Sequence, residues 1–252
     1  MFKELHNEIE PLIICNVWDV PSALVAERNG FSAIGTSSAA ISSMLGKDDG
    51  ENVLFEQLLT IANAISKATT LPLTVDIESG YGDTPAAIAN NIVELTKVGV
   101  VGINIEDSHV VQGERHLSDS TAFAQTLESV RELLSNADVD VFINVRSDAF
   151  LLNVDNALDV SIARVGQYQQ AGADGIFLPC IQKTEDIRSI VAATHLPVNV
   201  MCVPALPDFD ELKQLGVQRI SMGNFVYEAM LSSLSSLLSS VSKQQSFKPL
   251  FK

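Results

Sequence analysis

Three acidic residues and one arginine stand near the ends of apolar segments, where the catalytic groups of α/β proteins commonly lie. Asp76 and Glu78 close the segment 71–78, Glu106 lies near the end of 102–107, and Arg146 lies near the end of 139–148. Asp76 and Glu78 are two positions apart, so on one strand their side chains point to the same face. Carboxylates that converge without a counter-charge raise one another's pKa values, and a bound Mg2+ or Mn2+ is the simplest way to stabilise them. The pattern therefore predicts a divalent-metal site formed by Asp76, Glu78 and Glu106.

Arg146 carries the complementary charge. A guanidinium binds a carboxylate in a two-pronged geometry, so Arg146 predicts a small anionic substrate beside the metal. The alternative is that the acids form structural ion pairs with Arg146 and other basic residues, and spacing alone leaves both interpretations open.

Eight short runs rich in Val, Ile and Leu must position these side chains. Their nearly continuous apolar character is typical of strands buried on both faces of a parallel sheet. Segments with helical spacing separate them, and eight strands alternating with helices in about 250 residues are typical of a closed barrel. We therefore predict an α/β protein with one (β/α)8 TIM-type barrel domain over residues 1–252, with a doubly wound open sheet as the alternative. The runs are 12–18, 32–38, 71–78, 102–107, 139–148, 175–180, 196–203 and 219–224.

Two helical stripes and four glycines support the alternation. The stripes are interpreted as faces directed to the core, and each glycine follows a helical segment, where a positive φ is favoured. The stripes are Leu54, Leu58, Ile61, Ile65 and Met230, Leu234, Leu237, Val241, and the glycines are Gly30, Gly99, Gly172 and Gly216.

Composition restricts the partners and the surroundings of the chain. Its 16 basic and 31 acidic residues give a formal charge of −15, which argues against nucleic acid and anionic membranes as partners. No signal-like start and no run of 18 apolar residues are present, so we expect a cytoplasmic protein. The remaining residues of interest have structural interpretations. We expect Cys15, Cys180 and Cys202 to be buried, reduced thiols. We expect His6 and His195 to lie on the surface and Trp18 to be a packing residue.

Three motifs carry a resemblance to a known group of enzymes. DIESGYGD (76–83), GINIEDS (102–108) and VRSDAF (145–150), in this order, resemble the metal-binding strands of the phosphoenolpyruvate mutase and isocitrate lyase superfamily. The similarity extends over about residues 12–227. It implies a barrel enzyme that binds Mg2+ and stabilises an enolate of pyruvate type.

The resemblance also implies roles for individual residues. Asp76 would hold Mg2+, with Glu78 and Glu106 joining directly or through water, and Asp49 in the loop MLGKDDG (44–50) would lie near metal and substrate. Arg146 would hold the substrate carboxylate. Further substrate-binding candidates lie at the ends of the second and last strands: Thr36, Ser37, Ser38 and Asn224.

Two departures from the family pattern bear on the reaction. The loop after the fourth strand reads HVVQGERHLSD (109–119) and lacks the Lys, Cys, Gly, His run of the carbon–carbon lyases, so Glu114, Arg115 or His116 would have to do the proton work. The sixth strand ends in Pro179 and Cys180, where phosphonate-handling members place a histidine.

Three functions remain open at this point. The first is a Mg2+-dependent lyase that cleaves a C–C bond in a small α-oxo or 2-hydroxy di- or tricarboxylic acid. The second is P–C chemistry, as in a phosphoenolpyruvate phosphonomutase or phosphonopyruvate hydrolase, and the third is a barrel that binds a metabolite without turnover. By analogy with similar proteins, we also expect a homodimer or homotetramer in which the C-terminal helix is exchanged between subunits.

Overall fold

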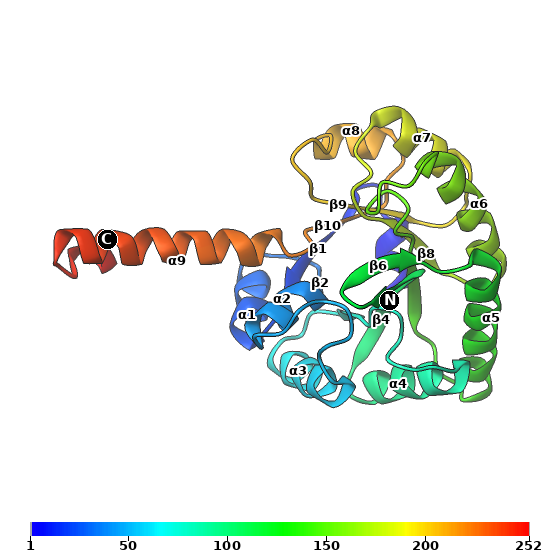
Figure 1. Cartoon of the computed structure of the whole chain (residues 1–252), viewed down its shortest axis with the longest axis horizontal. Coiled ribbons are helices and arrows are strands. Elements are labelled where there is room, and N and C mark those ends of the chain that lie inside the picture. Colours follow the sequence, from blue (N-terminus) through cyan, green and yellow to red (C-terminus); the bar gives the residue numbers. More distant parts are fainter. Residues whose placement is uncertain (1, 252) are drawn as a thin grey trace.

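Eight parallel strands close into a barrel (Figure 1), which confirms the predicted (β/α)8 architecture and excludes the open sheet. The structure is a computed structural model that describes residues 2–251. Around the barrel the strands follow the order β1-β10-β9-β8-β7-β4-β3-β2, and each corresponds to one predicted run. The barrel strands are β1 Leu12–Val17, β2 Ala33–Thr36, β3 Leu73–Asp76, β4 Val100–Glu106, β7 Phe142–Arg146, β8 Gly175–Leu178, β9 Val198–Met201 and β10 Arg219–Ser221.

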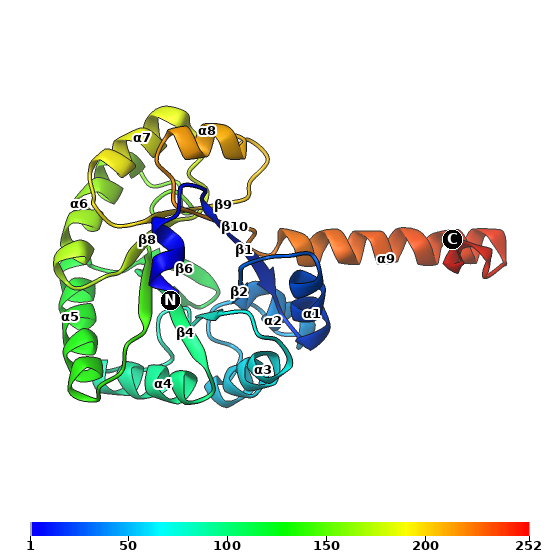
Figure 2. The same cartoon turned by 180° about the vertical axis from the view of Figure 1, so that it is seen from behind.

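Helices follow the strands and cover the outside of the barrel (Figures 1 and 2). The four glycines expected at helix ends all have φ between 79° and 97°, the left-handed region that glycine adopts without cost. The helices are η1 Lys3–Asn7, α1 Val20–Arg28, α2 Ser38–Met44, α3 Phe55–Ala68, α4 Pro85–Lys97, α5 Ser120–Asn136, α6 Ala157–Gln170, α7 Thr184–Ala192, α8 Phe209–Gln214, α9 Phe225–Gln244 and η2 Lys248–Leu250.

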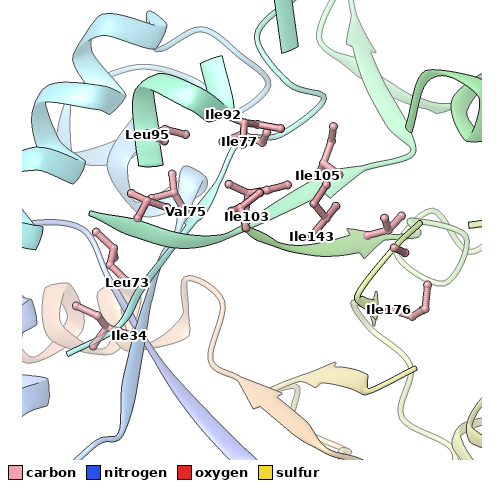
Figure 3. Packing of buried hydrophobic residues seen from close by; sticks show 14 of the residues in the cluster. Ile34, Leu73, Val75, Ile77, Ile92, Leu95, Ile103, Ile105, Ile143 and Ile176 are labelled. Atoms are coloured by element: carbon pink, nitrogen blue, oxygen red, sulfur yellow. The ribbon is translucent and has the colours of Figure 1, made fainter. Parts of the chain in front are cut away.

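The main core lies between the strands and the surrounding helices. In Figure 3, Ile92 and Leu95 of α4 lie beside Val75 and Ile77, and all four are buried. Because side chains alternate along a strand, outward Val75 leaves Asp76 directed into the barrel. On β3, alternation therefore separates outward apolar side chains from inward polar ones.

The N-terminal helix η1 closes the floor of the barrel, the end where the strands begin (Figure 2). His6 is buried there, with its ring stacked on Phe142 at a centroid distance of 4.3 Å and edge-on to Phe2 at 5.1 Å. The expectation of a surface position for His6 was therefore wrong, because nothing in the local sequence shows that η1 folds under the barrel. His195 is exposed as expected.

Helix α9 projects from the barrel (Figures 1 and 2), so one of the two stripes was misinterpreted. In α3, Leu58 and Ile65 are buried as expected. In α9, by contrast, Met230 is 41% exposed and Leu234 is 47% exposed, and Tyr227 is the helix's one buried residue. Within residues 2–251, η2 contacts α9, while the apolar side chains Met230, Leu234 and Leu238 stay exposed.

The remaining residues of interest divide between confirmation and correction. Trp18 is buried and packs edge-on against Tyr227 at a centroid distance of 4.9 Å, as expected of a packing residue. All three cysteines are free, but only Cys15 is buried: Cys180 is partly exposed and Cys202 is exposed, since both follow their strands in loops. Within residues 2–251 no helix has the length and apolar character needed to cross a membrane.

The loop after β4 forms a small antiparallel hairpin, β5 Ser108–Val111 and β6 Glu114–Leu117. Figure 1 shows it across the mouth of the barrel, the end where the strands finish. The segment expected to be a loop, 109–119, therefore has a regular structure of its own.

Candidate active site

The ends of three adjacent strands bring two carboxylates and one guanidinium to the mouth of the barrel. β3 ends at Asp76, β4 at Glu106 and β7 at Arg146. Glu106 is directly opposite Arg146 in the register of β4 and β7, and Asp76 is opposite Asn104 on the other side of β4. Asp76 and Glu106 are buried, so these charges meet in a region of low polarity where each affects its neighbours strongly.

Asp76 is fixed by β2 and by the turn that follows it. Its backbone N–H donates to Thr36 Oγ1 at 2.9 Å, and Ser38 Oγ donates to its Oδ2 at 3.0 Å. The backbone N–H of Glu78 donates to Oδ1 at 3.2 Å. Burial raises the pKa of Asp76 and the charge of Asp49 adds to this, while Arg146 opposes it.

Glu78 is buried but belongs to the turn and not to the strand. β3 ends at Asp76 and Glu78 has a φ of 50°, so the alternation that placed both side chains on one face does not hold here. Its Oε2 accepts the backbone N–H of Glu51 at 2.6 Å and its Oε1 accepts the hydroxyl of Tyr81 at 3.0 Å. Burial, followed by the charges of Asp49 and Asp76, raises the pKa of Glu78 to about 7.

Arg146 lies between two carboxylates. Its Nε donates to Asp148 Oδ1 at 2.6 Å and its Nη2 donates to Asp148 Oδ2 at 3.1 Å. Its Nη1 lies 3.0 Å from Glu106 Oε2 but is not directed at it, and this oxygen is buried with no hydrogen-bond donor. Burial raises the pKa of Glu106 above its ordinary range, partly offset by the charge of Arg146. Structural ion pairs are therefore part of this geometry, and they leave one carboxylate oxygen unsatisfied.

A buried network behind β4 and β7 holds Asp148 in place. Asp107 accepts the backbone N–H of Asp148 on Oδ1 at 2.9 Å, and its Oδ2 accepts the hydroxyls of Ser147 and Tyr168 and Nη1 of Arg164, each at 2.8 Å. Since both Asp107 and Asp148 are fully buried, their contacts fix the direction in which Arg146 points. Asp148 lies within the motif VRSDAF, but the sequence did not indicate that it orients Arg146.

Arg115 is the residue of the hairpin that enters the site. Its Nη1 contacts Glu106 Oε1, donates to Ser108 Oγ at 2.8 Å and lies 3.4 Å from Asp148 Oδ2. The side chain is 14% exposed. Arg115 therefore adds a second guanidinium to the mouth of the barrel.

Glu114 and His116, the predicted proton-transfer residues, lie on the other side of the hairpin. Their side chains are 83% and 51% exposed, and they pair with each other at 3.9 Å. The reason is strand alternation, which turns positions 114 and 116 outward when 115 points inward. In this arrangement neither of them reaches the carboxylates, and of the three loop residues it is Arg115 that contacts Glu106.

The loop between α2 and α3 completes the rim. Asp49 is half-exposed, and its Oδ2 lies 3.4 Å from Nη2 of Arg115. Glu51, which sequence reasoning missed, accepts Ser79 Oγ at 2.7 Å and the backbone N–H of Tyr81 at 2.9 Å. No local signal in the sequence distinguishes Glu51 from any other acidic residue of a loop.

The predicted substrate-binding residues divide into two groups. Thr36 and Ser38 contact Asp76 as described above, while the Ser37 side chain accepts the backbone N–H of Ala40 at 3.3 Å as the N-terminal cap of α2. Asn224 donates to Glu228 at 2.7 Å on its own helix and makes no contact with the strand-end charges. The second strand therefore contributes to the site, whereas Asn224 is turned to α9.

The donor set fits a hard dication. Glu106 Oε2 accepts no hydrogen bond, although Arg146 Nη1 lies 3.0 Å from it, and each oxygen of Asp76 accepts one hydrogen bond, so both carboxylates retain free lone pairs. Both oxygens of Glu78 are engaged in hydrogen bonds. No cluster of three His, Cys, Asp or Glu side chains within residues 2–251 is arranged to hold a metal ion. Two protein carboxylates with water or ligand oxygens completing the shell is a usual arrangement for Mg2+.

Comparison with known proteins gives consistent relatives over nearly the whole chain. The family model described as phosphoenolpyruvate phosphomutase matches residues 2–242. The uncharacterised protein Rv1998c of Mycobacterium tuberculosis is 35% identical over 230 residues, which cover 91% of this chain and 84% of that protein. Oxaloacetate decarboxylase 1 of Pseudomonas fluorescens is 31% identical over 226 residues, covering 86% of this chain and 75% of the relative.

Solved structures show the same fold. A protein of Burkholderia cenocepacia J2315, provisionally named a phosphonomutase, superposes with a TM-score of 0.88 at 38% identity, covering 94% of this chain and 97% of that one. An oxaloacetate acetylhydrolase bound to the inhibitor 3,3-difluorooxalacetate has a TM-score of 0.87 at 20% identity, with 98% and 86% of the two chains covered. At that lower identity the likeness concerns the fold.

Proposed function

The chain belongs to the phosphoenolpyruvate phosphomutase family of enzymes, and on that premise we propose that it is a divalent-metal-dependent lyase. Its substrate would be a small α-oxo or 2-hydroxy acid with more than one carboxylate, and the bond that breaks would be a C–C bond. The observation that carries the proposal is the junction of Asp76, Glu106 and Arg146 at adjacent strand ends. The oxaloacetate-cleaving relative is consistent with this class of chemistry.

Asp76 and Glu106 would hold the metal, and Glu78 would contribute through water. The support is the unsatisfied Oε2 of Glu106 together with the raised pKa values of all three buried carboxylates, which a nearby dication would lower. When bound, Mg2+ or Mn2+ would act as a Lewis acid on the oxo and carboxylate oxygens of the substrate.

The residues of the chain bind and orient the substrate. Arg146 is held by Asp148 through hydrogen bonds from Nε and Nη2, which leaves Nη1, 3.0 Å from Glu106 Oε2, as the nitrogen without a hydrogen bond to Asp148. A substrate carboxylate on this guanidinium would place the adjacent oxo group near Asp76 and Glu106. In a 2-oxo acid with a carboxylate on C3, the bond between C3 and this carboxylate would break, its electron pair would pass toward the oxo oxygen to give an enolate of pyruvate type, and the carboxylate would leave as CO2. In a 2-hydroxy acid the C2–C3 bond would break instead, and the hydroxyl proton would have to be removed.

A substrate panel tests the proposal. Purified protein with Mg2+ is incubated with oxaloacetate and with 2-hydroxy diacids such as malate and its alkylated forms, and release of pyruvate or glyoxylate is followed. We expect turnover of at least one acid that chelator abolishes and added Mg2+ restores. If oxalate and Mn2+ bind but no acid of the panel is cleaved, the alternative of a binding protein without turnover is favoured.

P–C bond chemistry is the second candidate, favoured by the 38% identical structure that carries the phosphonomutase name. The end of the sixth strand opposes it, because Pro179 and Cys180 stand there without a histidine. Phosphorus NMR with phosphonopyruvate and Mg2+ distinguishes the two. Conversion to phosphoenolpyruvate or to inorganic phosphate would replace the C–C proposal.

We also propose that the protein is a homodimer or homotetramer in which α9 packs on a partner subunit. An apolar groove of about 510 Å3 lies between α1 and the root of α9, lined by residues that include Trp18, Val25 and Val226. Along α9 itself, Leu234 and Leu238 are 47% and 55% exposed. Such an apolar face on a helix of 20 residues is expected to be covered. Light scattering should give at least a dimer at micromolar concentration, and the double variant Leu234→Glu, Leu238→Glu should shift it to monomer.

A further inference from the structure

Arg115 is placed as a second cation of the site, and neither the metal nor the first substrate carboxylate accounts for it. It comes from β6 on the hairpin, and Arg146 comes from the barrel strand β7. Both guanidiniums contact the same two carboxylates, Glu106 and Asp148. Because Arg115 and Arg146 contact the same carboxylates, they lie close enough for one small ligand to reach both guanidiniums.

The position of Arg115 is set by contacts of the hairpin with the rim. Gly50, in the loop between α2 and α3, packs so closely on Val110 of β5 that a Cβ at this glycine would lie 2.6 Å from Val110 Cγ2. The φ of Gly50 is 103°, which other residues rarely adopt. Nη2 of Arg115 adds a contact to Asp49 in the same loop at 3.4 Å. The hairpin and the loop together therefore hold Arg115 over the carboxylates.

Arg115 and a metal ion would share a ligand. Glu106 Oε1 is the oxygen that Arg115 contacts, and Glu106 is one of the two carboxylates with free lone pairs for a dication. A dication on Glu106 also repels the adjacent guanidinium. Once Glu106 is taken, the carboxylate contacts that remain to Arg115 are the 3.4 Å contacts to Asp148 and Asp49. A partly buried guanidinium in that state lacks a strong anionic partner.

We propose that Arg115 determines the specificity of the site for dicarboxylates. Before the substrate binds, Arg115 competes with the metal ion for Glu106. Once metal and substrate are both bound, Arg115 binds the second carboxylate of an acid whose first carboxylate lies on Arg146. This deepens the proposed function and rests on it.

Calorimetry on the full chain tests the proposal with defined probes. Mn2+ is titrated alone, and then oxalate or 3,3-difluorooxaloacetate is titrated at saturating Mn2+. The two adjacent carboxylates of oxalate stand in for the first carboxylate and the oxo group of the acid, so oxalate has no remote carboxylate for Arg115. The variants are Arg115→Met, which removes the charge at similar length, and Arg115→Lys, which keeps the charge but loses the fork. Arg28→Met, at the exposed end of α1, is the matched control.

We expect Arg115→Met to bind Mn2+ alone about fivefold more tightly, because the internal competitor is gone. It should bind difluorooxaloacetate at least about tenfold more weakly while its oxalate affinity changes by less than about twofold. Arg115→Lys should fall between Arg115→Met and the wild type for the diacid, and Arg28→Met should match the wild type. Circular dichroism verifies that each variant is folded.

Three results would overturn the inference. If Arg115→Met bound oxalate and difluorooxaloacetate equally more weakly, Arg115 would have a merely structural role in the hairpin. If it bound both as tightly as the wild type does, Arg115 would not be part of the binding site. Weaker Mn2+ binding in Arg115→Met would contradict the competition. A wild-type chain that binds neither Mn2+ nor oxalate would instead refute the proposed function, so the two failures are distinguishable.

Discussion

The two ends of the barrel both bury charge, but they do so in opposite ways. At the floor, Arg219 is fully buried, and its Nε and Nη1 have no hydrogen-bond partner, while Nη2 donates to Asn104 at 3.3 Å. Burial lowers the pKa of Arg219 to about 9. At the mouth, Glu106 and Asp148 are shared by two guanidiniums.

The difference shows which end of the barrel can exchange partners. Carboxylates that are shared between two arginines can pass from one cation to another, so the proposed metal and an anionic substrate could enter together without leaving a charge unpaired. The floor offers no such exchange, because the rings of Phe2, His6 and Phe142 pack on one another and Arg219 has no carboxylate partner there among the described residues. The mouth is therefore suited to chemistry and the floor to stability, in agreement with the usual division in these barrels.

The largest expected effect is at Asp76. Asp76→Asn keeps an acceptor for Ser38 but removes the charge, so we expect metal affinity to be lost and kcat/KM to fall by about 10³-fold. The unfolding temperature should stay the same or rise, because a buried carboxylate of raised pKa is removed. Calorimetry with Mn2+, turnover and thermal unfolding measure the three quantities.

Asp83→Asn is the control for this change, since Asp83 is an exposed acid in the same strand-to-helix turn. If Asp76→Asn retained metal affinity, the proposal that the mouth of the barrel, unlike the floor, binds a metal ion would be contradicted.

The pH dependence of Glu78 is the second test. Its folded pKa of about 7 lies above the ordinary 4.5, so its protonated form stabilises the fold below pH 4.5 and this contribution is lost as pH rises through 7. Glu78→Gln should therefore gain up to about 3 kcal/mol over the wild type between pH 4.5 and 8. Chemical unfolding at several pH values measures this, with Glu56→Gln, an exposed acid of α3, as the control. An advantage of Glu78→Gln that did not grow with pH would contradict the buried position of this carboxylate.

His6 should show a change of similar size and opposite direction. Burial, aided by the charge of Arg219, lowers its pKa to about 4, so stability is present above pH 6.5 and is lost as pH falls through 4. His6→Phe keeps a ring on Phe142 and should gain up to about 3 kcal/mol over the wild type as pH falls across this window. The same unfolding series, with the exposed His195→Phe as control, measures it. Equal acid sensitivity of His6→Phe and the wild type would show that another group dominates the floor.

The smallest effect is expected at Arg219. Arg219→Met has a similar length and removes a buried charge that has no carboxylate partner, so stability should rise by about 1 kcal/mol. Activity should change by less than about twofold, because Arg219 begins β10 at the end opposite the site. Unfolding and turnover are compared with Arg28→Met. A large loss of activity would break the proposed division between floor and mouth.

Strand number, strand order along the chain and most of the candidate site could be predicted from the sequence. Asp76, Glu106 and Arg146 were identified because apolar runs mark the strands and the mouth lies at their ends. Glu78 was identified as well, although its position came from the turn and not from the alternation used to place it. These residues have local signals that do not depend on the rest of the fold.

The hairpin of β5 and β6 contains a residue of the site that could not be predicted from the sequence. In the sequence, Glu114, Arg115 and His116 all look like polar residues of a surface loop. Which of them enters the site depends on which side of the hairpin faces the barrel. That side is set by the packing of Val110 on Gly50, a contact between segments 60 residues apart. The same reason applies to Glu51, whose partners Glu78 and Tyr81 lie on another loop.

By itself, the sequence determined the eight strands, their alternation with helices and the strand-end acids, because hydrophobic periodicity is a local property that survives in any arrangement of the elements. Closure of the barrel, as opposed to an open sheet, was decided by the tertiary structure. Only the tertiary structure decided that His6 is buried under the floor, that the stripe of α9 faces away from its own barrel, and that Arg115 and not its neighbours enters the mouth. Each of these depends on contacts between distant segments, whose free energies no local pattern records.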